Sequence, residues 1–213
     1  MIQRCRRQST KTAPALFIAA VLLALGPFMG LPKAVLAYGQ LVASPLAVCN
    51  TLNEVKSATG ESGFETLGQG ATGAGAGGLI GSCWHAFAQK VVSDEPGFIA
   101  VTSKASVWKT TRAAHQAYLA WVNSPKGPHW VSSRRYSDSN NHIRADEIHQ
   151  FYFVAPSNDP SSADFYTSAQ VMFRKGNAIG FALAESRGSA TGYLGDALVA
   201  DTLVSLIGKR VRK

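Results

Sequence analysis

The amino-acid sequence predicts an α+β fold: a single domain after a signal peptide, in which two amphipathic helices cover an antiparallel β-sheet. The clearest observation is a strand–turn–strand pattern over residues 169–184, where Gly176 and Asn177 are residue types that tolerate a positive φ in a tight turn. The apolar pattern of a helix follows over residues 194–207. The same order, strands and then an amphipathic helix, occurs earlier over residues 83–123. Strands and helices grouped in this way are typical of an α+β domain.

The first 37 residues have the pattern of a signal peptide. A basic start precedes an apolar run over residues 15–25, and Val35 and Ala37 place small residues before a cleavage site. We therefore expect cleavage after Ala37 and a secreted or extracytoplasmic protein. An uncleaved membrane anchor is the alternative, although a Gly-Pro pair interrupts the run, which is shorter than the roughly 20 residues of a membrane span. A twin-arginine signal at Arg6 and Arg7 lacks the usual apolar pair after it.

The positive charge of the chain comes largely from this segment. The sequence has 21 basic and 13 acidic residues, and five basic but no acidic residues precede residue 38. The rest of the chain has a net charge of only +3, which does not indicate a nucleic-acid partner. A basic cluster from Lys209 to Lys213 is expected to be a solvated tail, with weak contact to an anionic membrane surface as the alternative.

Two cysteines remain after the signal peptide, Cys49 and Cys83. An even pair in an exported protein predicts a disulfide, which contributes about 3–4 kcal/mol on the loop-entropy model. One alternative is lipidation of Cys49, although Val48 before it is unfavourable for a lipobox. Another is a thiol–imidazole pair of Cys83 and His85 in a hydrolase.

We expect residues 38–80 to form an N-terminal extension and residues 81–213 to form the α+β domain. Within the extension, residues 52–66 indicate a short helix or an edge strand, and residues 68–78 indicate a flexible glycine-rich loop. The glycines match G-x-G-x-x-G at Gly68, Gly70 and Gly73, but no βαβ unit follows, which argues against a dinucleotide site. No cofactor is predicted.

The first half of the domain begins with a strand over residues 83–92. Its two faces alternate, one with Trp84, Ala86 and Ala88, the other with His85, Phe87 and Gln89. A second strand is predicted over residues 98–102 and a helix over residues 106–123, with Ser106 as its N-cap.

In the second half, strands are predicted over residues 130–133, 148–154, 169–173 and 177–184, with polar loops over residues 134–144 and 156–164. The last strand has small side chains on one face and large side chains on the other. The small side chains indicate that a helix covers that face closely. They belong to Ala178, Gly180, Ala182 and Ala184. The final helix is expected to end with Gly208 at C′, where Lys209 and Arg210 suit the helix dipole.

Three segments carry a resemblance to known proteins. Residues 171–180 (VMFRKGNAIG) are similar to a "VxFRRGNVV" hairpin, residues 201–207 to a helix ending "LAxxLxxRI", and residues 145–147 (ADE) to a "GDE" before a strand. Over residues 145–210 the chain resembles small exported bacterial α+β domains, including the extracellular sensor domains of some mycobacterial kinases and the PsbP-like lipoproteins. The resemblance implies a fold and supplies no catalytic residues.

No metal site or hydrolase motif is predicted. His142 and His149, with Asp146 and Glu147 between them, match no zinc signature. G-x-S-x-G and H-E-x-x-H are absent after residue 37.

Aromatic side chains are the candidate ligand contacts. We expect Trp108, Trp130 and Tyr136 to bind a ligand at the sheet face or the loop rims, with Trp108 partly exposed on its helix. The sequence thus predicts a secreted or cell-surface ligand-binding or sensing module without catalytic activity, acting on a small ligand or an envelope partner. Two alternatives remain: an extracytoplasmic hydrolase with a Cys/His or serine nucleophile, and a structural envelope protein.

Overall fold

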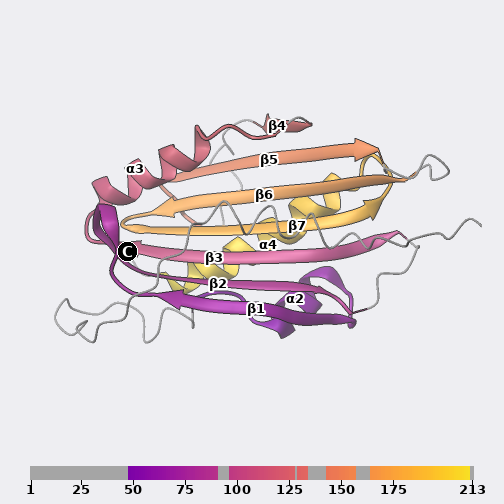
Figure 1. Cartoon of the computed structure of the whole chain (residues 1–213), viewed down its shortest axis with the longest axis horizontal. Coiled ribbons are helices and arrows are strands. Elements are labelled where there is room, and N and C mark those ends of the chain that lie inside the picture. Colours follow the sequence, from indigo (N-terminus) through magenta and orange to yellow (C-terminus); the bar gives the residue numbers. More distant parts are fainter. Residues whose placement is uncertain (1–47, 91–95, 128, 134–142, 157–163, 212–213) are drawn as a thin grey trace, which may run out of the picture. The chain divides into compact units, whose positions relative to one another are not determined.

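The computed structural model describes residues 48–90, 96–127, 129–133, 143–156 and 164–211, all within one compact unit. It contains a seven-stranded sheet in the order β1-β2-β3-β7-β6-β5-β4, in which every neighbouring pair is antiparallel (Figure 1). The strands are β1 (Phe64–Thr72), β2 (Leu79–Gln89), β3 (Gly97–Trp108), β4 (Trp130–Ser133), β5 (Glu147–Pro156), β6 (Phe165–Lys175) and β7 (Ala178–Gly188). The described helices are α2 (Leu52–Thr59), a 3₁₀ turn η2 (Ala76–Gly78), α3 (Thr111–Val122) and α4 (Tyr193–Arg210). The predicted fold class is confirmed.

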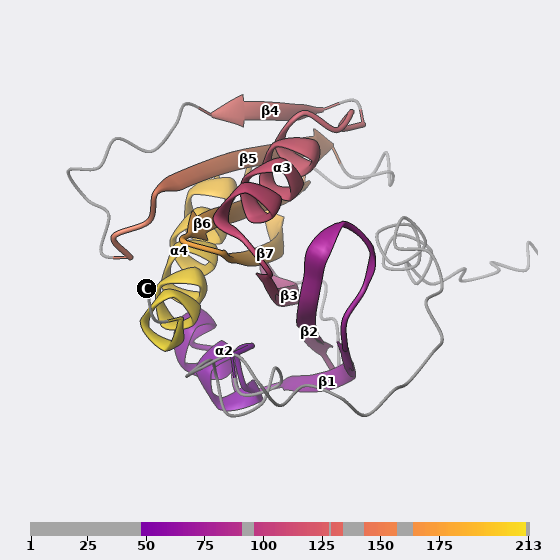
Figure 2. The same ribbon diagram turned by 90° about the vertical axis from the view of Figure 1, so that its left-hand side faces the viewer.

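The helices lie on opposite faces of the sheet. Helices α4 and α2 cover one face and α3 the other (Figure 2). Each face has its own apolar cluster. The cluster under α4 includes Phe87, Val101, Phe173, Leu203, Val204 and Ile207. The cluster under α3 consists of Ala114, Tyr118, Met172, Ile179, Phe181 and Leu183.

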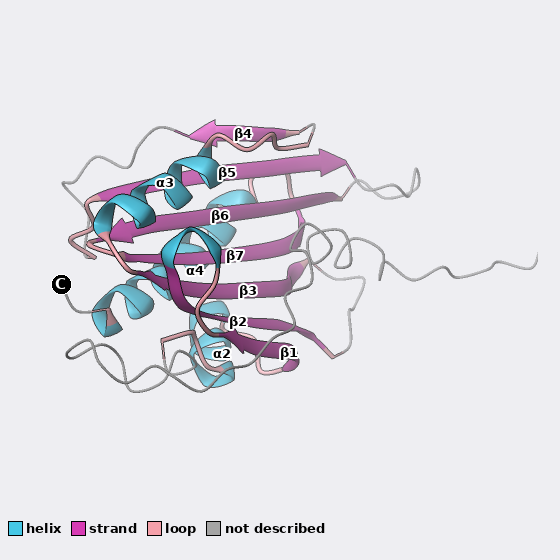
Figure 3. Ribbon diagram, turned by 60° about the vertical axis from the view of Figure 1, so that its left-hand side comes forward, coloured by secondary structure: helices cyan, strands magenta, loops and turns pink. Residues whose placement is uncertain are grey.

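Strand β7 has the two faces that the sequence predicted. Its small residues lie under α4, where a Cβ added to Gly180 would collide with the ring of Phe173 and come within 2.9 Å of Ile207. Its large residues lie in the cluster under α3. Figure 3 shows α3 crossing in front of β5 and β6. Helix α4 therefore approaches the sheet closely because β7 presents no side-chain bulk there.

The glycine-rich segment differs from the prediction. Residues 68–72 belong to β1, so the expectation of a flexible loop is wrong for them. The indole of Trp84 lies against the backbone of this strand: a Cβ on Gly68 would come within 3.1 Å of the ring, and one on Gly70 would come within 3.0 Å of ring carbon Cε2. The glycines thus make room for an aromatic side chain. For residues 52–66, where the sequence indicated a short helix or an edge strand, the structure has both: helix α2 and the start of strand β1. The sheet therefore begins at Phe64, before the predicted domain boundary at residue 81.

The predicted helix over residues 106–123 starts later. Strand β3 continues to Trp108 because its end pairs with both neighbours, Val107 opposite Ala178 and Trp108 opposite Leu79. Helix α3 begins at Thr111, and the side chain of Thr110 accepts a hydrogen bond from the Ala113 amide at 3.1 Å. The predicted N-cap at Ser106 is therefore wrong.

The last helix also ends differently. Helix α4 continues through Gly208 to Arg210, with Val211 as its C-cap. Gly208 is buried against Ile143, where a Cβ would collide. This glycine serves close packing and not the expected turn.

Tyr136, His142, the cleavage site after Ala37 and residues 212–213 lie outside the described residues. Among the residues that the structure describes, no helix is both long and apolar enough to cross a membrane.

Candidate functional site

The two predicted aromatic residues that the structure describes both pack against the apolar cluster under α3. Trp108 lies at the end of β3, not on a helix, and its Nε1 donates a hydrogen bond to Ser106 Oγ at 3.1 Å. Trp130 lies on β4, with its ring 5.4 Å from that of Phe153. Both are partly buried, so they stabilise the attachment of α3, and their role in ligand binding stays a prediction.

The cysteine–histidine pair does not form a nucleophilic site. Cys49 and Cys83 form the predicted disulfide, with a Cα–Cα distance of 6.1 Å. His85 Nδ1 lies 2.7 Å from the carbonyl oxygen of Asn50. A carbonyl only accepts hydrogen bonds, so Nδ1 carries the proton. The hydrolase alternative based on Cys83 and His85 is therefore wrong for the oxidised protein, since the sulfur that would attack is in the disulfide.

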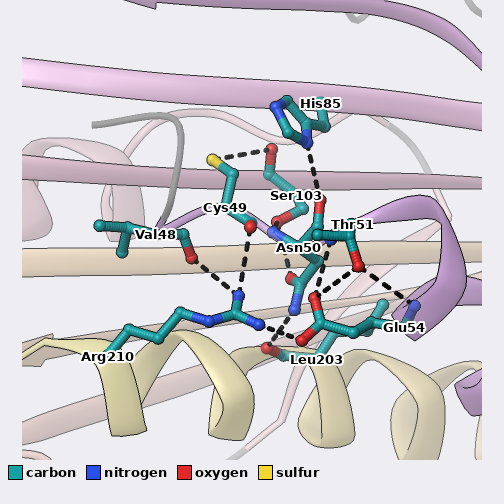
Figure 4. A network of polar contacts seen from close by, with 9 residues as sticks. All are labelled: Val48, Cys49, Asn50, Thr51, Glu54, His85, Ser103, Leu203 and Arg210. Atoms are coloured by element: carbon teal, nitrogen blue, oxygen red, sulfur yellow. Dashed lines mark hydrogen bonds and ion pairs between the residues drawn. The ribbon is translucent and has the colours of Figure 1, made fainter. Parts of the chain in front are cut away.

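A network of polar contacts, centred on the buried Asn50, lies next to Cys49 (Figure 4). Asn50 is fully buried; its Oδ1 accepts a hydrogen bond from Ser103 Oγ at 2.7 Å, and its Nδ2 donates to the carbonyl of Leu203 at 3.1 Å. The Arg210 guanidinium donates to the carbonyls of Val48, at 3.2 Å, and Cys49, at 3.1 Å, and pairs with Glu54. The network joins residues 48–54 to β3 and α4, so the prediction of a solvated basic tail is wrong for Arg210.

A second polar cluster holds the β6–β7 turn. Arg174 donates to Asp146 at 3.0 Å and pairs with Glu147, whose Oε2 also lies 2.9 Å from His115 Nδ1. Burial alone would raise the pKa of Glu147, but Arg174 and His115 outweigh it and hold that pKa below its ordinary value. The acidic pair in the ADE segment is therefore structural.

No group of three or more His, Cys, Asp or Glu residues in the described part of the chain has the arrangement of a metal site.

The sheet face on the α3 side carries a second kind of polar group. Trp84 on β2, Lys104 on β3 and Phe181 on β7 lie directly opposite one another on neighbouring strands, so their side chains share this face. Lys104 Nζ lies 5.8 Å from the centre of the Phe181 ring. Among the described residues, Lys104 makes no hydrogen bond or ion pair, and burial lowers the pKa of its ammonium group. A partly buried cation thus lies beside the Phe181 ring without a carboxylate.

Two further polar side chains lie on the same face, nearer the other end of the sheet. Ser168 on β6 is opposite Glu185 on β7, which is opposite Ala100 on β3. The Ser168 hydroxyl is buried and has no hydrogen-bond partner in the structure. Burial raises the pKa of the Glu185 carboxyl to about 7. We call Trp84, Lys104, Ser168, Phe181 and Glu185 the sheet-face patch. The sequence analysis missed it because the patch exists only once β3 pairs with β7.

A buried carboxyl lies on the opposite face behind this patch. Asp196 of α4 accepts a hydrogen bond from Thr167 Oγ1 at 2.7 Å, and Thr167 Oγ1 lies 2.9 Å from Ser186 Oγ. Thr167 directly precedes Ser168 on β6, and Ser186 directly follows Glu185 on β7. Because successive residues of a strand point to opposite faces, Thr167 and Ser186 point to the other side of the sheet. Burial raises the pKa of Asp196 to about 7, against the hydrogen bonds from Thr167 and Ser186, and the charge of Glu185 adds to the shift.

Comparison with known proteins gave one structural likeness. No family model matches the chain, and no curated protein matches it. The crystal structure of the extracellular domain of PknH from Mycobacterium tuberculosis is 10% identical, with a TM-score of 0.49, over 76% of this chain and 94% of that chain.

Proposed function

We propose that this chain is an extracytoplasmic ligand-binding module without catalytic activity, which captures an organic anion on the sheet face at Lys104. The observation that supports this most directly is the Lys104 ammonium group, partly buried and without an anionic partner among the described residues. Removing an ammonium group from water is costly unless the charge is paired. A bound anion supplies the missing partner through a charge-assisted hydrogen bond.

The surroundings of Lys104 favour an anion with an apolar body. The Phe181 ring lies beside it and Trp84 is the residue opposite it on β2. Ala86 and Leu183 lie one step further along the same face of their strands. Apolar and aromatic walls with a few polar groups are the common composition of small-molecule sites. A medium-length carboxylate such as undecanoate has both features and is a suitable probe.

The bonding of the two residues that the sequence suggested for catalysis, Cys83 and His85, supports binding over hydrolysis. Cys83 is in a disulfide, and His85 donates to the Asn50 carbonyl. These side chains stabilise the fold.

The structural-envelope alternative receives little support. The large apolar side chains that are exposed in the described part are Leu67, Val131, Leu194 and Leu198. Leu194 and Leu198 are neighbours on α4, with 59% and 69% of their surface exposed, while the other two lie on the edge strands β1 and β4. Scattered exposed apolar residues are normal on soluble proteins.

The test is a calorimetric titration of the protein with undecanoate. Because hydrogen bonds to charged groups contribute about 1.5–3 kcal/mol, Lys104→Gln should bind undecanoate about 10- to 100-fold more weakly than the unsubstituted protein. Lys90 is exposed, so Lys90→Gln is the matched control and should bind as the unsubstituted protein does. Equal affinities of the two variants, or no binding of undecanoate by the folded protein, would refute the proposal.

A further inference from the structure

We propose that the sheet face carries a second subsite, formed by Phe153, Ser168 and Glu185, which binds an organic ammonium group. Together with the anion site at Lys104, it makes the ligand an extended molecule with opposite charges at its two ends. The two-ended ligand rests on the proposed function, whereas the ammonium subsite is testable without it.

The sheet register places the three side chains side by side. Phe153 on β5 is opposite Ser168 on β6, and Ser168 is opposite Glu185 on β7. Directly opposed residues of antiparallel strands project to the same face. Glu185 and Phe181 are an even number of residues apart on β7, so the subsite lies on the same face as Lys104.

Two polar groups of the subsite lack partners among the described residues. Ser168 is only 2% exposed, and its Oγ makes no hydrogen bond. Buried hydroxyls are nearly always hydrogen-bonded, so the Ser168 hydroxyl has an acceptor position beside a carboxyl group that a bound ammonium group would fill. Glu185 forms no hydrogen bond or ion pair with any described residue, and burial raises its pKa to about 7.

The charged residues around Glu185 do not neutralise it. Arg187, two residues further on the same strand, is paired with Asp164 at 2.9 Å. Asp196, behind the sheet on α4, is itself acidic and interacts unfavourably with Glu185. Lys104 is on β3, four residues from Ala100, the residue opposite Glu185. Other titratable side chains on this face are His129, with its ring centre 6.1 Å from that of Phe153, and Lys126, with its Nζ 4.9 Å from the centre of the Phe151 ring. Neither pairs with Glu185, so the subsite has an unmatched carboxyl group.

The chemistry of the three side chains fits an ammonium group. A carboxylate accepts charge-assisted hydrogen bonds, a hydroxyl accepts another, and an aromatic face attracts a cation. A calcium ion is a poor match because it takes six to eight oxygen ligands. No group of three acidic or histidine side chains suited to a metal occurs within the described ranges.

The spacing of the two subsites sets the length of the ligand. Lys104 and Ala100 are four positions apart on β3, which corresponds to about 13 Å along the strand. Between them this face presents Thr102, Leu183 and Ala86, a largely apolar floor. An ω-amino acid with a long alkyl chain, such as ω-aminoundecanoate, has an anion, an apolar body and a cation in this order.

The experiment measures the affinities of three probes at pH 8 by calorimetry: undecanoate, undecylammonium and ω-aminoundecanoate. We expect ω-aminoundecanoate to bind at least tenfold more tightly than undecanoate. Glu185→Gln should abolish this preference and the binding of undecylammonium. Ser168→Ala should weaken undecylammonium binding, and Glu65→Gln, at an exposed carboxylate of β1, is the matched control.

A pH series adds a second readout. Between pH 6 and pH 8 the affinity for undecylammonium should rise about tenfold as Glu185 ionises, and Glu185→Gln should remove this dependence. If undecylammonium binds the control and the Glu185→Gln variant equally, or does not bind, the ammonium subsite is refuted. If the protein binds undecylammonium but not undecanoate, the anion site at Lys104 is refuted. The binding of undecylammonium still tests the ammonium subsite independently.

Discussion

At the scale of single residues, Asp196 is the side chain whose state depends most on the fold. It is fully buried, its Oδ1 has no hydrogen-bond partner in the structure, and its pKa is raised from the ordinary 3.8 to about 7. A carboxyl group with a raised pKa in the folded state favours folding while it is protonated. That contribution is fully present below pH 4 and is lost as the pH rises through 7.

The substitution Asp196→Asn tests this directly. The amide mimics the protonated carboxyl, so the variant should lose the part of the pH dependence of stability that lies between pH 4 and pH 7. A shift of about three pKa units corresponds to at most about 4 kcal/mol, which is the upper limit of the gain at pH 8. Urea unfolding at pH 5 and pH 8 measures it, and a variant less stable than the parent at pH 8 would contradict the assignment.

At the scale of elements, the distance between β7 and α4 is set by small side chains. Gly180 lies beneath α4, where an added Cβ collides with Phe173 and lies close to Ile207. The backbone conformation of Gly180 is not left-handed, so conformation does not require a glycine here. The requirement comes from packing.

We therefore expect Gly180→Ala to destabilise the fold by about 1–3 kcal/mol, the range of overpacked cores. Gly127→Ala is the control, since a Cβ there meets nothing within 4 Å and its φ is not positive. Thermal unfolding of both variants is the measurement. Equal melting temperatures would show that β7 and α4 separate at little cost.

At the scale of the whole molecule, the predicted export and the disulfide belong together. The bridge joins Cys49 to Cys83, 34 residues apart, and ties the segment before α2 to β2, the strand next to the edge strand β1. The buried Asn50 network lies next to it, so loss of the disulfide also loosens the attachment of α4.

The intact mass of the exported protein should correspond to a chain that starts at Tyr38 with its disulfide formed. Reduction should lower the free energy of unfolding by about 3–4 kcal/mol. Mass spectrometry and urea unfolding with and without reductant are the measurements. Two free thiols in the exported protein, one of them reactive at neutral pH, would restore Cys83 as a candidate nucleophile.

The sequence by itself determined the features that depend on neighbouring residues. The β6–β7 hairpin, the two faces of β7 and α4 follow from periodicity and turn chemistry, which act over a few residues. The disulfide followed from the number of cysteines and the expected compartment.

Only the tertiary structure decided the rest, because those features join residues that are distant in the chain. Gly68 and Gly70 lie in a strand because β1 pairs with β2, and β3 reaches Trp108 because β2 and β7 pair with it. Arg210 is held by carbonyls of residues 48 and 49. Lys104 and Glu185 share a face through the strand order, and pairing between strands distant in sequence leaves no local pattern to read.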